Sequence, residues 1–569
     1  MSDLRHTERV DQDAETGGRQ PGRWDQLLRA LLSPASVQDE APLRAWLRRG
    51  SLLVVTLLAL GIGLFRIGVP SPWVDEAVTV LVVRRPWSGI TALLQGADAP
   101  LVPYYLLAKA WAGLLAGLPT LVAVRSLSAV AAAITVAAAF TLVARLTGIR
   151  TALMAALLLT SLVGFSRYAQ EARPYALLVM TATLSWLAWD GWRRPTPEDP
   201  RPRGSLPTQV GGAAVYVGSL IGSVLFHLFG LFQWPAHVLA DLATPGTSGS
   251  ARVRRAVYTA AAMVVAVVLV GFPLFYAATH GTGAPRLVPM TLMTLRETFL
   301  QALNSSVQLA PSLPVLILAG IAILAVAVRL RIARAYTRLV VIGVIWTGIP
   351  LALSIVAALA RPALLRPRYW LPMMVPLSAL AAVGALIIAD TVWHLVRGHG
   401  QAARPRIAAA TVVAAVSLAV VLSVQAVMVK PGQLDIRKEN GHALSLKPAL
   451  KLVDSYLESE PDLPFTVTPN TRTTVVWAMR PDLVERDVLL GLDQTAATVW
   501  PSTREAAEIA RRLEGQNTVV WMRAAIMGTT ITTKLKPKVA PKALQDLGFT
   551  VVSAQRAGSW WICLLQRPE

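Results

Sequence analysis

Long apolar runs, separated by short polar stretches, recur through most of this chain of 569 residues. A helix needs about 20 apolar residues to cross a bilayer, and about eleven runs approach that length. They lie near 51–69, 121–144, 151–167, 172–192, 211–230, 232–246, 256–277, 313–329, 338–360, 369–396 and 406–429. The pattern predicts a polytopic α-helical membrane protein with about eleven transmembrane helices.

One further apolar stretch, from Pro100 to Pro119, is predicted not to cross the membrane. Arginine-rich loops between spans usually face the cytoplasm. With the N-terminus inside and this stretch kept outside, the arginine clusters between Arg145 and Arg406 are cytoplasmic, except a small group near Arg366. We therefore expect a re-entrant or interfacial helix at 100–119, a cytoplasmic N-terminus and an extracytoplasmic C-terminus.

The stretch 211–246 leaves two alternatives open. It is interrupted by His227, Gly230, Gln233, Trp234 and Pro235. We interpret it as two spans joined by an outside turn. One long tilted helix is the alternative, and it would invert the topology of everything that follows.

The composition changes at both ends of the apolar region. Residues 1–50 are polar and lack the early apolar stretch of a cleavable signal, which indicates a cytoplasmic tail. The transmembrane domain is predicted at 51–429, with a first outer loop at 70–120. Residues 430–569 have ordinary polarity and predict an extracytoplasmic α/β domain.

Short apolar segments predict the strands of this C-terminal domain. They are Phe465–Thr468, Val488–Leu490, Thr518–Trp521, Thr550–Ser553 and Trp560–Leu565. A helix is predicted from Ser502 to Leu513, because Ser502 followed by Glu505 three residues later is the pattern of a capping box.

The overall composition agrees with a membrane protein. Hydrophobic residues make up 54% of the chain and charged residues 15%, and the mean hydropathy is +0.51. The formal charge of +21 does not indicate nucleic-acid binding, because the arginines form short clusters between spans and no basic groove interleaved with aromatics. Cys563, the only cysteine, excludes an internal disulfide and a cysteine-based zinc site.

Five polar groups fall at outer ends of the predicted spans. They are Asp75 with Glu76; Asp98; the turn 166–175; His227 with Gln233 and His237; and the segment 361–369. Acids at a membrane edge are costly unless they pair or react. A carboxylate can accept a proton from an attacking hydroxyl, and arginines bind phosphate through parallel hydrogen bonds. The joint pattern indicates a site for a lipid phosphate that enters from the bilayer.

Each group taken alone has a simpler explanation. The adjacent acids fit a solvated loop, and the acid before Pro100 fits a turn. Glu171 fits an ion pair with Arg173 or Arg167 that holds two spans together, and His227 fits a hydrogen-bonded histidine at a helix end. The arginines near 366 fit cations that extend to the membrane interface.

Five segments, in order, resemble a known family. They are Trp73-Val74-Asp75-Glu76-Ala77; Asp98–Leu106, similar to a D-x-H-P-P-L-Y-Y-L helix; Arg125–Ala129, similar to R-L-P-S-A; Tyr168–Leu177, close to Y-S-Q-E-A-R-x-Y-A-L; and Arg368–Pro372, similar to R-Y-L-L-P. Over about residues 50–430 the chain resembles the GT-C glycosyltransferases, in the branch of family 39 and the RgtA/B/C/D-like enzymes near protein O-mannosyltransferases and lipid A aminoarabinose transferases. One departure is Ala99, where the family has a histidine, so a role of that histidine does not transfer.

The resemblance implies a role for each matching residue. The implied catalytic acids are Asp75, Glu76 and Glu171, with Asp75 as the general base. The residues implied to orient acceptor or donor are Asp98, Tyr104, Tyr168, Gln170 and His227, and those implied to bind the donor phosphate are Arg173, Arg368, Tyr369 and Arg366. The clustered acids leave a divalent cation (Mg²⁺ or Mn²⁺) open, with Asp75 and Asp98 as its ligands, although arginines can neutralise a phosphate without one.

The implied function is that of an inverting glycosyltransferase of the cell membrane. It would move a mannose- or arabinose-like sugar from a polyprenyl-phosphate donor in the bilayer to an extracytoplasmic cell-wall glycan, glycolipid or protein. Two alternatives stay open. A transporter or flippase of lipid-linked sugars is disfavoured, because its polar residues would lie mid-span. A catalytically inactive scaffold with the same fold is not distinguished by the sequence.

Overall fold

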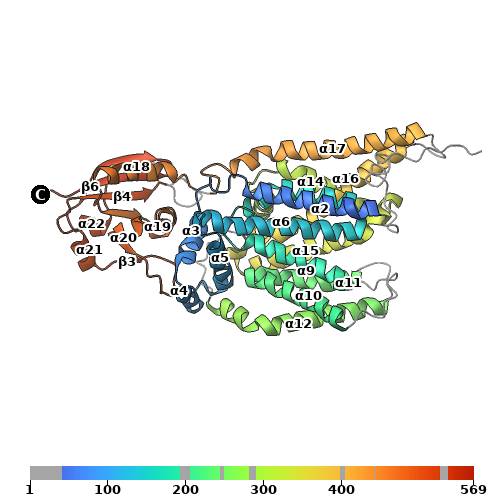
Figure 1. Cartoon of the computed structure of the whole chain (residues 1–569), viewed down its shortest axis with the longest axis horizontal. Helices are drawn as coiled ribbons and strands as arrows, with labels where there is room; N and C mark the ends of the chain where they lie inside the picture. The colour runs from blue at the N-terminus through green and yellow to red at the C-terminus, as the bar shows by residue number, and fades with distance from the viewer. Residues whose placement is uncertain are drawn as a thin grey trace, which may run out of the picture.

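The computed structural model describes residues 42–192, 206–243, 249–280, 290–397, 404–442, 444–525 and 536–568. Long helices lie side by side in a bundle, and an α/β domain packs at one end of it (Figure 1). Three short helices, α3, α4 and α5, lie between these two parts. Most of the predicted N-terminal tail lies outside the described residues, and the first described helix already begins at Pro42.

The bundle confirms the predicted helical membrane fold. Its helices are α2 (Pro42–Leu64), α6 (Thr120–Thr147), α7 (Ile149–Ser161), α8 (Val163–Tyr168), α9 (Tyr175–Trp192), α10 (Leu206–Phe226), α11 (Trp234–Ala243), α12 (Gly249–His280), α14 (Leu313–Ala327), α15 (Thr337–Ala360), α16 (Met374–Arg397) and α17 (Arg404–Asp435). A helix covers each predicted span. Among the described residues, 7 helices are long and apolar enough to cross a membrane. The count of about eleven stays a prediction.

The stretch 211–246 forms two helices rather than one long helix. Helix α10 ends at Phe226, a 3-10 turn, η3, follows at Leu228–Gln233, and α11 begins at Trp234. The turn folds tightly against the end of α10, because a Cβ on Gly230 would lie 2.3 Å from the carbonyl oxygen of Ser223. Only glycine fits such a close approach of two backbones.

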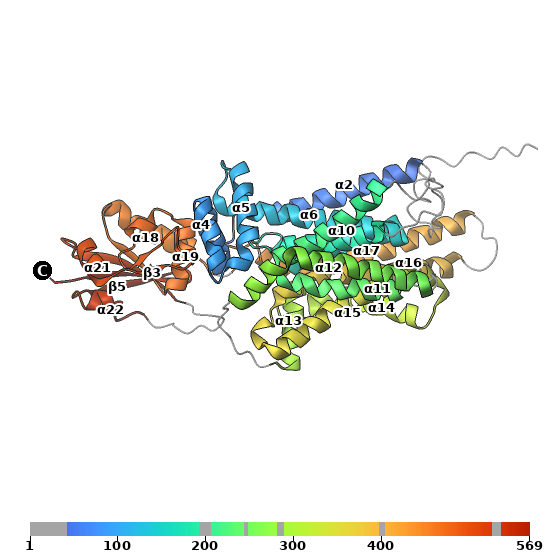
Figure 2. The same cartoon turned by 90° about the horizontal axis from the view of Figure 1, so that it is seen from below.

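The segment after α2 runs across the end of the bundle, as predicted for 100–119. It contains α3 (Val74–Arg84), α4 (Trp87–Thr91), η1 (Ala92–Gln95), η2 (Ala99–Leu101) and α5 (Val102–Leu114). Helix α5 is only 13 residues long and lies across the direction of the bundle helices (Figure 2). Lys109 on α5 donates to the carbonyls of Val83 and Arg85 at 3.0 and 2.7 Å, which satisfies the C-terminal end of α3.

Short elements complete both ends of the bundle. They are α13 (Leu292–Asn304), η4 (Ala310–Ser312), η5 (Arg331–Tyr336), η6 (Pro362–Leu364), η7 (Pro367–Tyr369) and η8 (Leu371–Met373). The segment η6 to η8 connects α15 to α16 at the end that faces α3, and it carries Arg368.

At the opposite end of the bundle, buried acids hold helix ends together. Asp390 on α16 accepts hydrogen bonds from Arg150 at 2.9 Å and from the Tyr336 hydroxyl at 3.0 Å. Asp190 on α9 accepts from Arg338 at 3.2 Å and has Arg145 at 3.9 Å. These arginines begin or end their helices, so this end of the bundle is basic.

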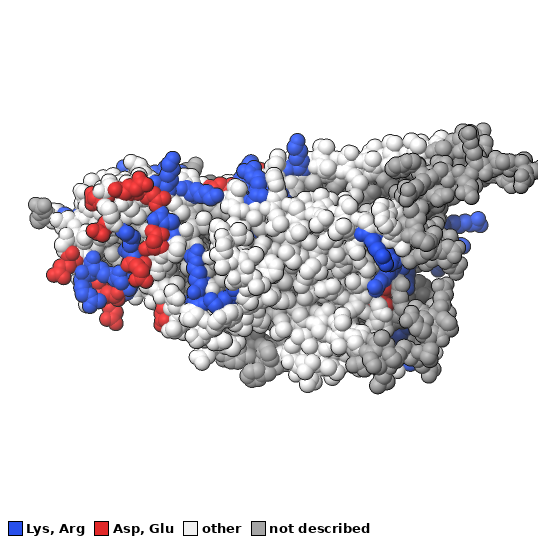
Figure 3. Space-filling view, in the orientation of Figure 1, with Lys and Arg blue, Asp and Glu red and all other residues white. Residues whose placement is uncertain are grey.

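The C-terminal domain is α/β, as predicted. Its four-stranded sheet has the order β1-β4-β6-β5, with β1 (Phe465–Thr468) parallel to β4 (Thr518–Ala524), and β6 (Trp560–Gln566) antiparallel to both β4 and β5 (Thr550–Ala557). Its helices are α18 (Lys447–Ser459), α19 (Asn470–Met479), α20 (Leu483–Arg486), α21 (Ala506–Arg512) and α22 (Lys542–Gln545). Exposed charges gather on this domain, whereas most of the visible bundle surface is uncharged (Figure 3).

The predicted capping box at Ser502 is wrong. Residues Ser502–Thr503 form the short strand β3, which pairs with β2 (Leu490–Gly491), and α21 begins only at Ala506. Arg504 fixes this strand, since its Nε donates to the carbonyls of Asp487 and Leu490 at 3.1 and 3.0 Å. Pairing with β2 therefore overrides the local capping signal.

The C-terminal domain clamps the end of α3. The side chain of Arg85, which is buried, donates to the carbonyls of Ala496 and Thr498 at 2.9 and 2.7 Å, and Arg84 donates to the carbonyl of Trp477 at 3.3 Å. Helix α3 is thus held by the bundle on one side and by the α/β domain on the other.

Candidate active site

Asp75 lies in the first turn of α3 and faces two arginines from different parts of the chain. Its Oδ2 is 3.4 Å from Arg368 Nη1 and 3.9 Å from Arg173 Nη2. The side chain keeps 28% of its surface exposed. Both contacts are longer than a tight ion pair, which is about 2.7–2.9 Å. The carboxylate is therefore held in place but still accessible.

Each of the two arginines has spare hydrogen-bonding capacity. The Nε atoms of Arg173 and Arg368 are buried and have no hydrogen-bond partner among the described residues. Buried donors are normally satisfied, and a group left over in a native site calls for a ligand or water. The guanidinium of Arg368 also lies over the rings of Trp73 and Tyr175, at 5.4 and 5.6 Å, which fixes its plane.

Glu76, although adjacent to Asp75, is fully buried and fully partnered. Arg125 donates to both of its oxygens at 2.8 and 2.9 Å, and the backbone N–H of Ala172 donates to Oε1 at 2.9 Å. His442 Nδ1 lies 3.0 Å from Oε2. Burial alone would raise the pKa of this carboxyl, but Arg125 and then His442 hold it well below its ordinary value. Glu76 therefore stays ionised and ties α3 to α6, to the turn before α9 and to the linker after α17.

Glu171 is also buried, and it pairs with Arg167 rather than Arg173. Arg167 Nη1 donates to Oε2 at 2.7 Å, and Trp73 Nε1 donates to Oε1 at 3.0 Å. Burial raises the pKa of Glu171 to about 7 despite the opposing charge of Arg167. Glu171 thus orients Trp73, the ring beneath Arg368.

Asp98 and the tyrosines of α5 approach Arg173 from the other side. Burial raises the pKa of Asp98, and the charge of Arg173 opposes that rise. The Tyr105 hydroxyl is 3.5 Å from Arg173 Nη1, whereas the hydroxyl of Tyr104 is buried without a partner in the described structure. The tyrosine that reaches Arg173 is therefore Tyr105, and sequence reasoning selected its neighbour.

His227, Tyr369 and Tyr168 form an aromatic wall beside Arg368. The His227 ring is 4.6 Å from the Tyr369 ring, and Tyr168 packs edge-on against Tyr175 at 5.7 Å. Backbone N–H of Phe229 donates to His227 Nδ1 at 3.2 Å, so this histidine is held by its own turn.

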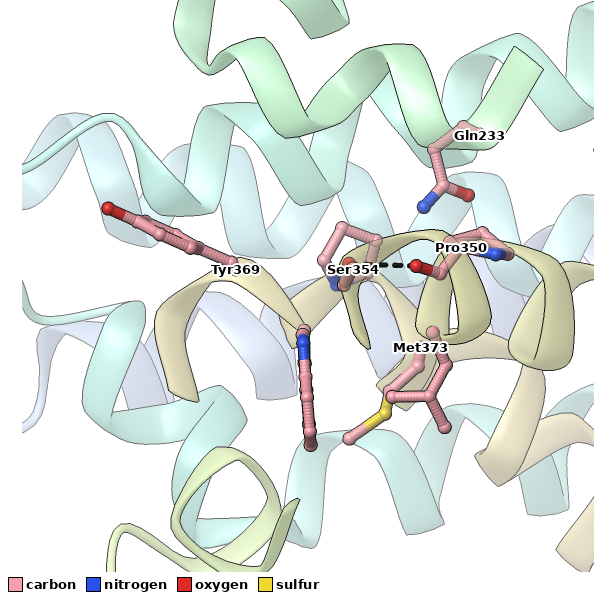
Figure 4. A pocket seen from close by; sticks show the side chains of 8 residues that line it. Gln233, Pro350, Ser354, Tyr369 and Met373 are labelled. Carbon is pink, nitrogen blue, oxygen red and sulfur yellow. Dashed lines mark hydrogen bonds between the residues drawn. The ribbon is translucent and has the colours of Figure 1, made fainter. Parts of the chain in front are cut away.

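Behind Tyr369 the packing closes. A small cavity there, with room for about one water, is bordered by Gln233, Ser354 and Met373, and the Tyr369 ring points away from them (Figure 4). The Ser354 hydroxyl is already used, since it donates to the carbonyl of Pro350 at 2.7 Å. This cavity has no space for a substrate.

Gln170 serves the scaffold in this structure, and Arg366 is not an ion-pair partner of Asp75. Gln170 is buried, and its Nε2 donates to the carbonyls of Gly63 and Phe65 at 2.9 and 2.8 Å, which satisfies the end of α2. The ion pairs of Asp75 are with Arg173 and Arg368 rather than with Arg366.

Sequence reasoning missed three residues of the site as structural partners: Trp73, Arg125 and His442. The first two lie inside the quoted motifs, and their burial beside acids was the missing information. His442 lies in the linker after α17, 366 positions from Glu76. The only signal for it in the sequence was that it is a single histidine in a polar segment.

The acids do not form a ready metal site. No group of three or more His, Cys, Asp or Glu side chains with metal-binding spacing occurs in the described part of the chain. Two guanidiniums already face Asp75, and a divalent cation there would meet their repulsion. The donor set therefore does not fit the Mg²⁺ or Mn²⁺ that the sequence left open.

Comparisons with known proteins give a match in structure only. No protein-family model matches the chain, and no curated protein sequence matches it. The structure is similar to ArnT from Cupriavidus metallidurans in the apo state, with 13% identity, a TM-score of 0.53, and coverage of 91% of this chain and 98% of that one.

Two further similar structures have lower scores. ArnT from the same organism bound to undecaprenyl phosphate is 15% identical, with a TM-score of 0.46 and coverage of 91% and 97%. The Archaeoglobus fulgidus oligosaccharyltransferase AglB, in complex with an inhibitory peptide and a dolichol-phosphate, is 11% identical, with a TM-score of 0.45 and coverage of 84% and 69%. The likeness to apo ArnT shows that the chain has the GT-C fold, which confirms the predicted fold.

Proposed function

We propose that this GT-C protein is a glycosyltransferase that uses a polyprenyl-phosphate sugar as donor and Asp75 as general base. The observation that carries the proposal is an accessible carboxylate between two arginines, each with a buried N–H that has no partner in the described part of the chain. A base and two phosphate ligands within one site are the parts that this reaction requires.

In the proposed reaction an acceptor hydroxyl attacks the anomeric carbon of the sugar. Its proton passes to an oxygen of Asp75, and the bond between the anomeric carbon and the phosphate oxygen breaks. The electron pair leaves with the polyprenyl phosphate, whose new charge faces Arg173 and Arg368. One displacement inverts the anomeric configuration, so a single carboxylate base is sufficient.

The other acids support Asp75 in this proposal. Glu76 positions α3 through Arg125 and His442, and Glu171 positions Trp73 beneath Arg368. Four residues of this network, Glu76, Arg125, His442 and Glu171, are buried, which suits groups that hold geometry rather than exchange protons with a substrate. Asp98, half-buried near Arg173, is the proposed second acid that orients the acceptor.

We also propose that the Asp75 end faces away from the cytoplasm. The opposite end carries Arg145, Arg150 and Arg338, as cytoplasmic ends usually do. The acceptor is then a cell-wall glycan, a glycolipid or a secreted protein. The position of the charges at one end of the bundle, rather than mid-span, disfavours a transporter of lipid-linked sugars.

Synthetic polyprenyl-phosphate sugars test the proposal directly. Purified full-length protein should transfer the sugar, or slowly hydrolyse the donor, and Asp75→Asn should reduce the rate about 10²–10⁴-fold. Asp435→Asn is a matched control, because Asp435 is an exposed aspartate paired with Lys438 outside the site. Equal rates for Asp75→Asn and the wild type would remove Asp75 as the base. A wild type inert toward every donor would overturn the function itself.

A further inference from the structure

A second, larger cavity lies on the side of the bundle. It has a volume of about 590 Å³ and is formed by α2, α7 and α17. Most of its surface is apolar, with Leu57 and Phe65 on α2 and Ala426 on α17 among its lining residues. Pockets that hold small molecules have similar volumes, about 300–1,000 Å³. None of its lining residues contacts Asp75, so this groove is separate from the site described above.

The groove is apolar along its length and basic at one end. Lys430 and Arg437 line it near the end of α17, which is the end that leads to the α/β domain. Among the described residues that line the groove, none is acidic. Leu57, Leu58 and Ala426 are exposed on the bundle surface, where a membrane protein meets the acyl chains of lipids. A charged end joined to an apolar channel matches a molecule with an anionic head and a long tail.

Arg437 has unused capacity at this end. It is 4% exposed, and its Nη1 and Nη2 donate to the carbonyls of Gln433 and Ile62 at 2.7 and 3.0 Å. Its Nε is buried and lacks a partner in the described structure. Lys430 lines the same groove, is exposed, and makes no hydrogen bond or ion pair with any described residue. A lysine that merely extended to the membrane surface would not need an arginine buried in the same groove.

We propose that this groove binds an anionic phospholipid of the surrounding bilayer, with its phosphate at Lys430 and Arg437 and an acyl chain along α2 and α17. Exposed residues of the bundle surface line the groove and Asp75 is not among them, which favours a resident membrane lipid over the sugar donor. Basic pockets between transmembrane helices bind anionic head groups through this kind of charge complementarity. The proposal does not depend on the glycosyltransferase activity.

Native mass spectrometry of the full-length protein in detergent tests the site. Dioleoylphosphatidylglycerol and dioleoylphosphatidylcholine are titrated separately, and the first should bind more tightly as a single retained lipid. Lys430→Gln removes one charge and should weaken phosphatidylglycerol binding about fivefold, since a cation at the surface contributes about 1 kcal/mol. Lys438→Gln is the control, because Lys438 is paired with Asp435 and does not line the groove.

Two further measurements decide the position and the occupant. Ala426→Trp should fill the groove and abolish retention of phosphatidylglycerol. If Ala426→Trp does not fold, Lys430→Gln still tests the proposal, because it changes an exposed residue. Equal binding of the two phospholipids, or no difference between Lys430→Gln and Lys438→Gln, would overturn the proposal. If undecaprenyl phosphate displaces phosphatidylglycerol at equimolar concentration, the groove belongs to the isoprenoid lipid instead and the assigned occupant is wrong.

Discussion

The two ends of the bundle use the same chemical groups in different ways. At the basic end, Asp390 accepts short hydrogen bonds from Arg150 and Tyr336 and is almost fully buried. At the other end, Asp75 lies 3.4 and 3.9 Å from Arg368 and Arg173 and is partly exposed. Both are aspartates that face cations, so the residue types alone do not separate a structural pair from a reactive one.

The two aspartates differ in the length of their contacts and in whether the neighbouring cations have unused hydrogen-bond donors. A buried acid with short, complete hydrogen bonds has no lone pair or space left for a substrate. Asp75 keeps both, and the arginines beside it each have an Nε without a hydrogen-bond partner among the residues that the structure describes. The same contrast separates Asp75 from its neighbour Glu76, whose oxygens are fully used. The tightly bound acid holds the fold, and the loosely bound acid is available for chemistry.

The largest expected effect comes from breaking the supporting network. Glu76→Gln leaves the buried Arg125 without a counter-charge, and removing one partner of a buried ion pair costs about 3–5 kcal/mol. Thermal unfolding of the purified protein should show this as a lower melting temperature. Asp75→Asn, one residue away, should leave the melting temperature nearly unchanged, since exposed changes cost about 0.5 kcal/mol or less. A Glu76→Gln variant that is as stable as the wild type but inactive would instead make Glu76 part of the chemistry.

These particular residues show what the sequence could and could not predict. Hydropathy is a local signal, so it gave the positions of the helices, and arginine counting excluded 100–119 as a span. The sequence also selected Asp75, Arg173 and Arg368, which the fold brings together. It did not show which of two adjacent acids would be enclosed, because that depends on His442, 366 positions away. The false helix start at Ser502 has a related origin, because a pairing with β2 lies outside the four residues of the capping pattern.

A pH profile gives a second, smaller way to test the comparison. Glu171 lies in the turn between α8 and α9, outside the spanning helices, and burial raises its pKa from 4.5 to about 7. The folded state therefore binds a proton that the unfolded state releases. The contribution of Glu171 to the free energy of unfolding is therefore present at low pH. It falls by on the order of 3 kcal/mol as the pH rises from about 4.5 to 7.

The opposing change at His442 can be separated from this one. The pKa of His442 is lowered to about 3, mainly by burial. The unfolded state therefore binds a proton before the folded state does, and the protein loses stability as the pH falls below about 6.5. Glu171→Gln removes only the first contribution. The difference between the melting temperatures of the wild type and Glu171→Gln should therefore shift in favour of the variant between pH 5 and 8. A difference that does not change with pH would show that Glu171 is ionised throughout.

The smallest effects compare one arginine at each end of the bundle. Arg368→Gln removes a proposed phosphate ligand, and a hydrogen bond to a charged group contributes about 1.5–3 kcal/mol, so KM for the donor should rise about ten- to hundredfold. The value of kcat should fall less, because Arg173 still faces Asp75. Arg338→Gln should leave both constants unchanged and cost less than about 1 kcal/mol of stability, since Arg338 is 42% exposed and Asp190 keeps Arg145. If the two variants lose activity equally, the two ends of the bundle do not differ in function. The long contacts and partial exposure of Asp75 would then not identify the active site.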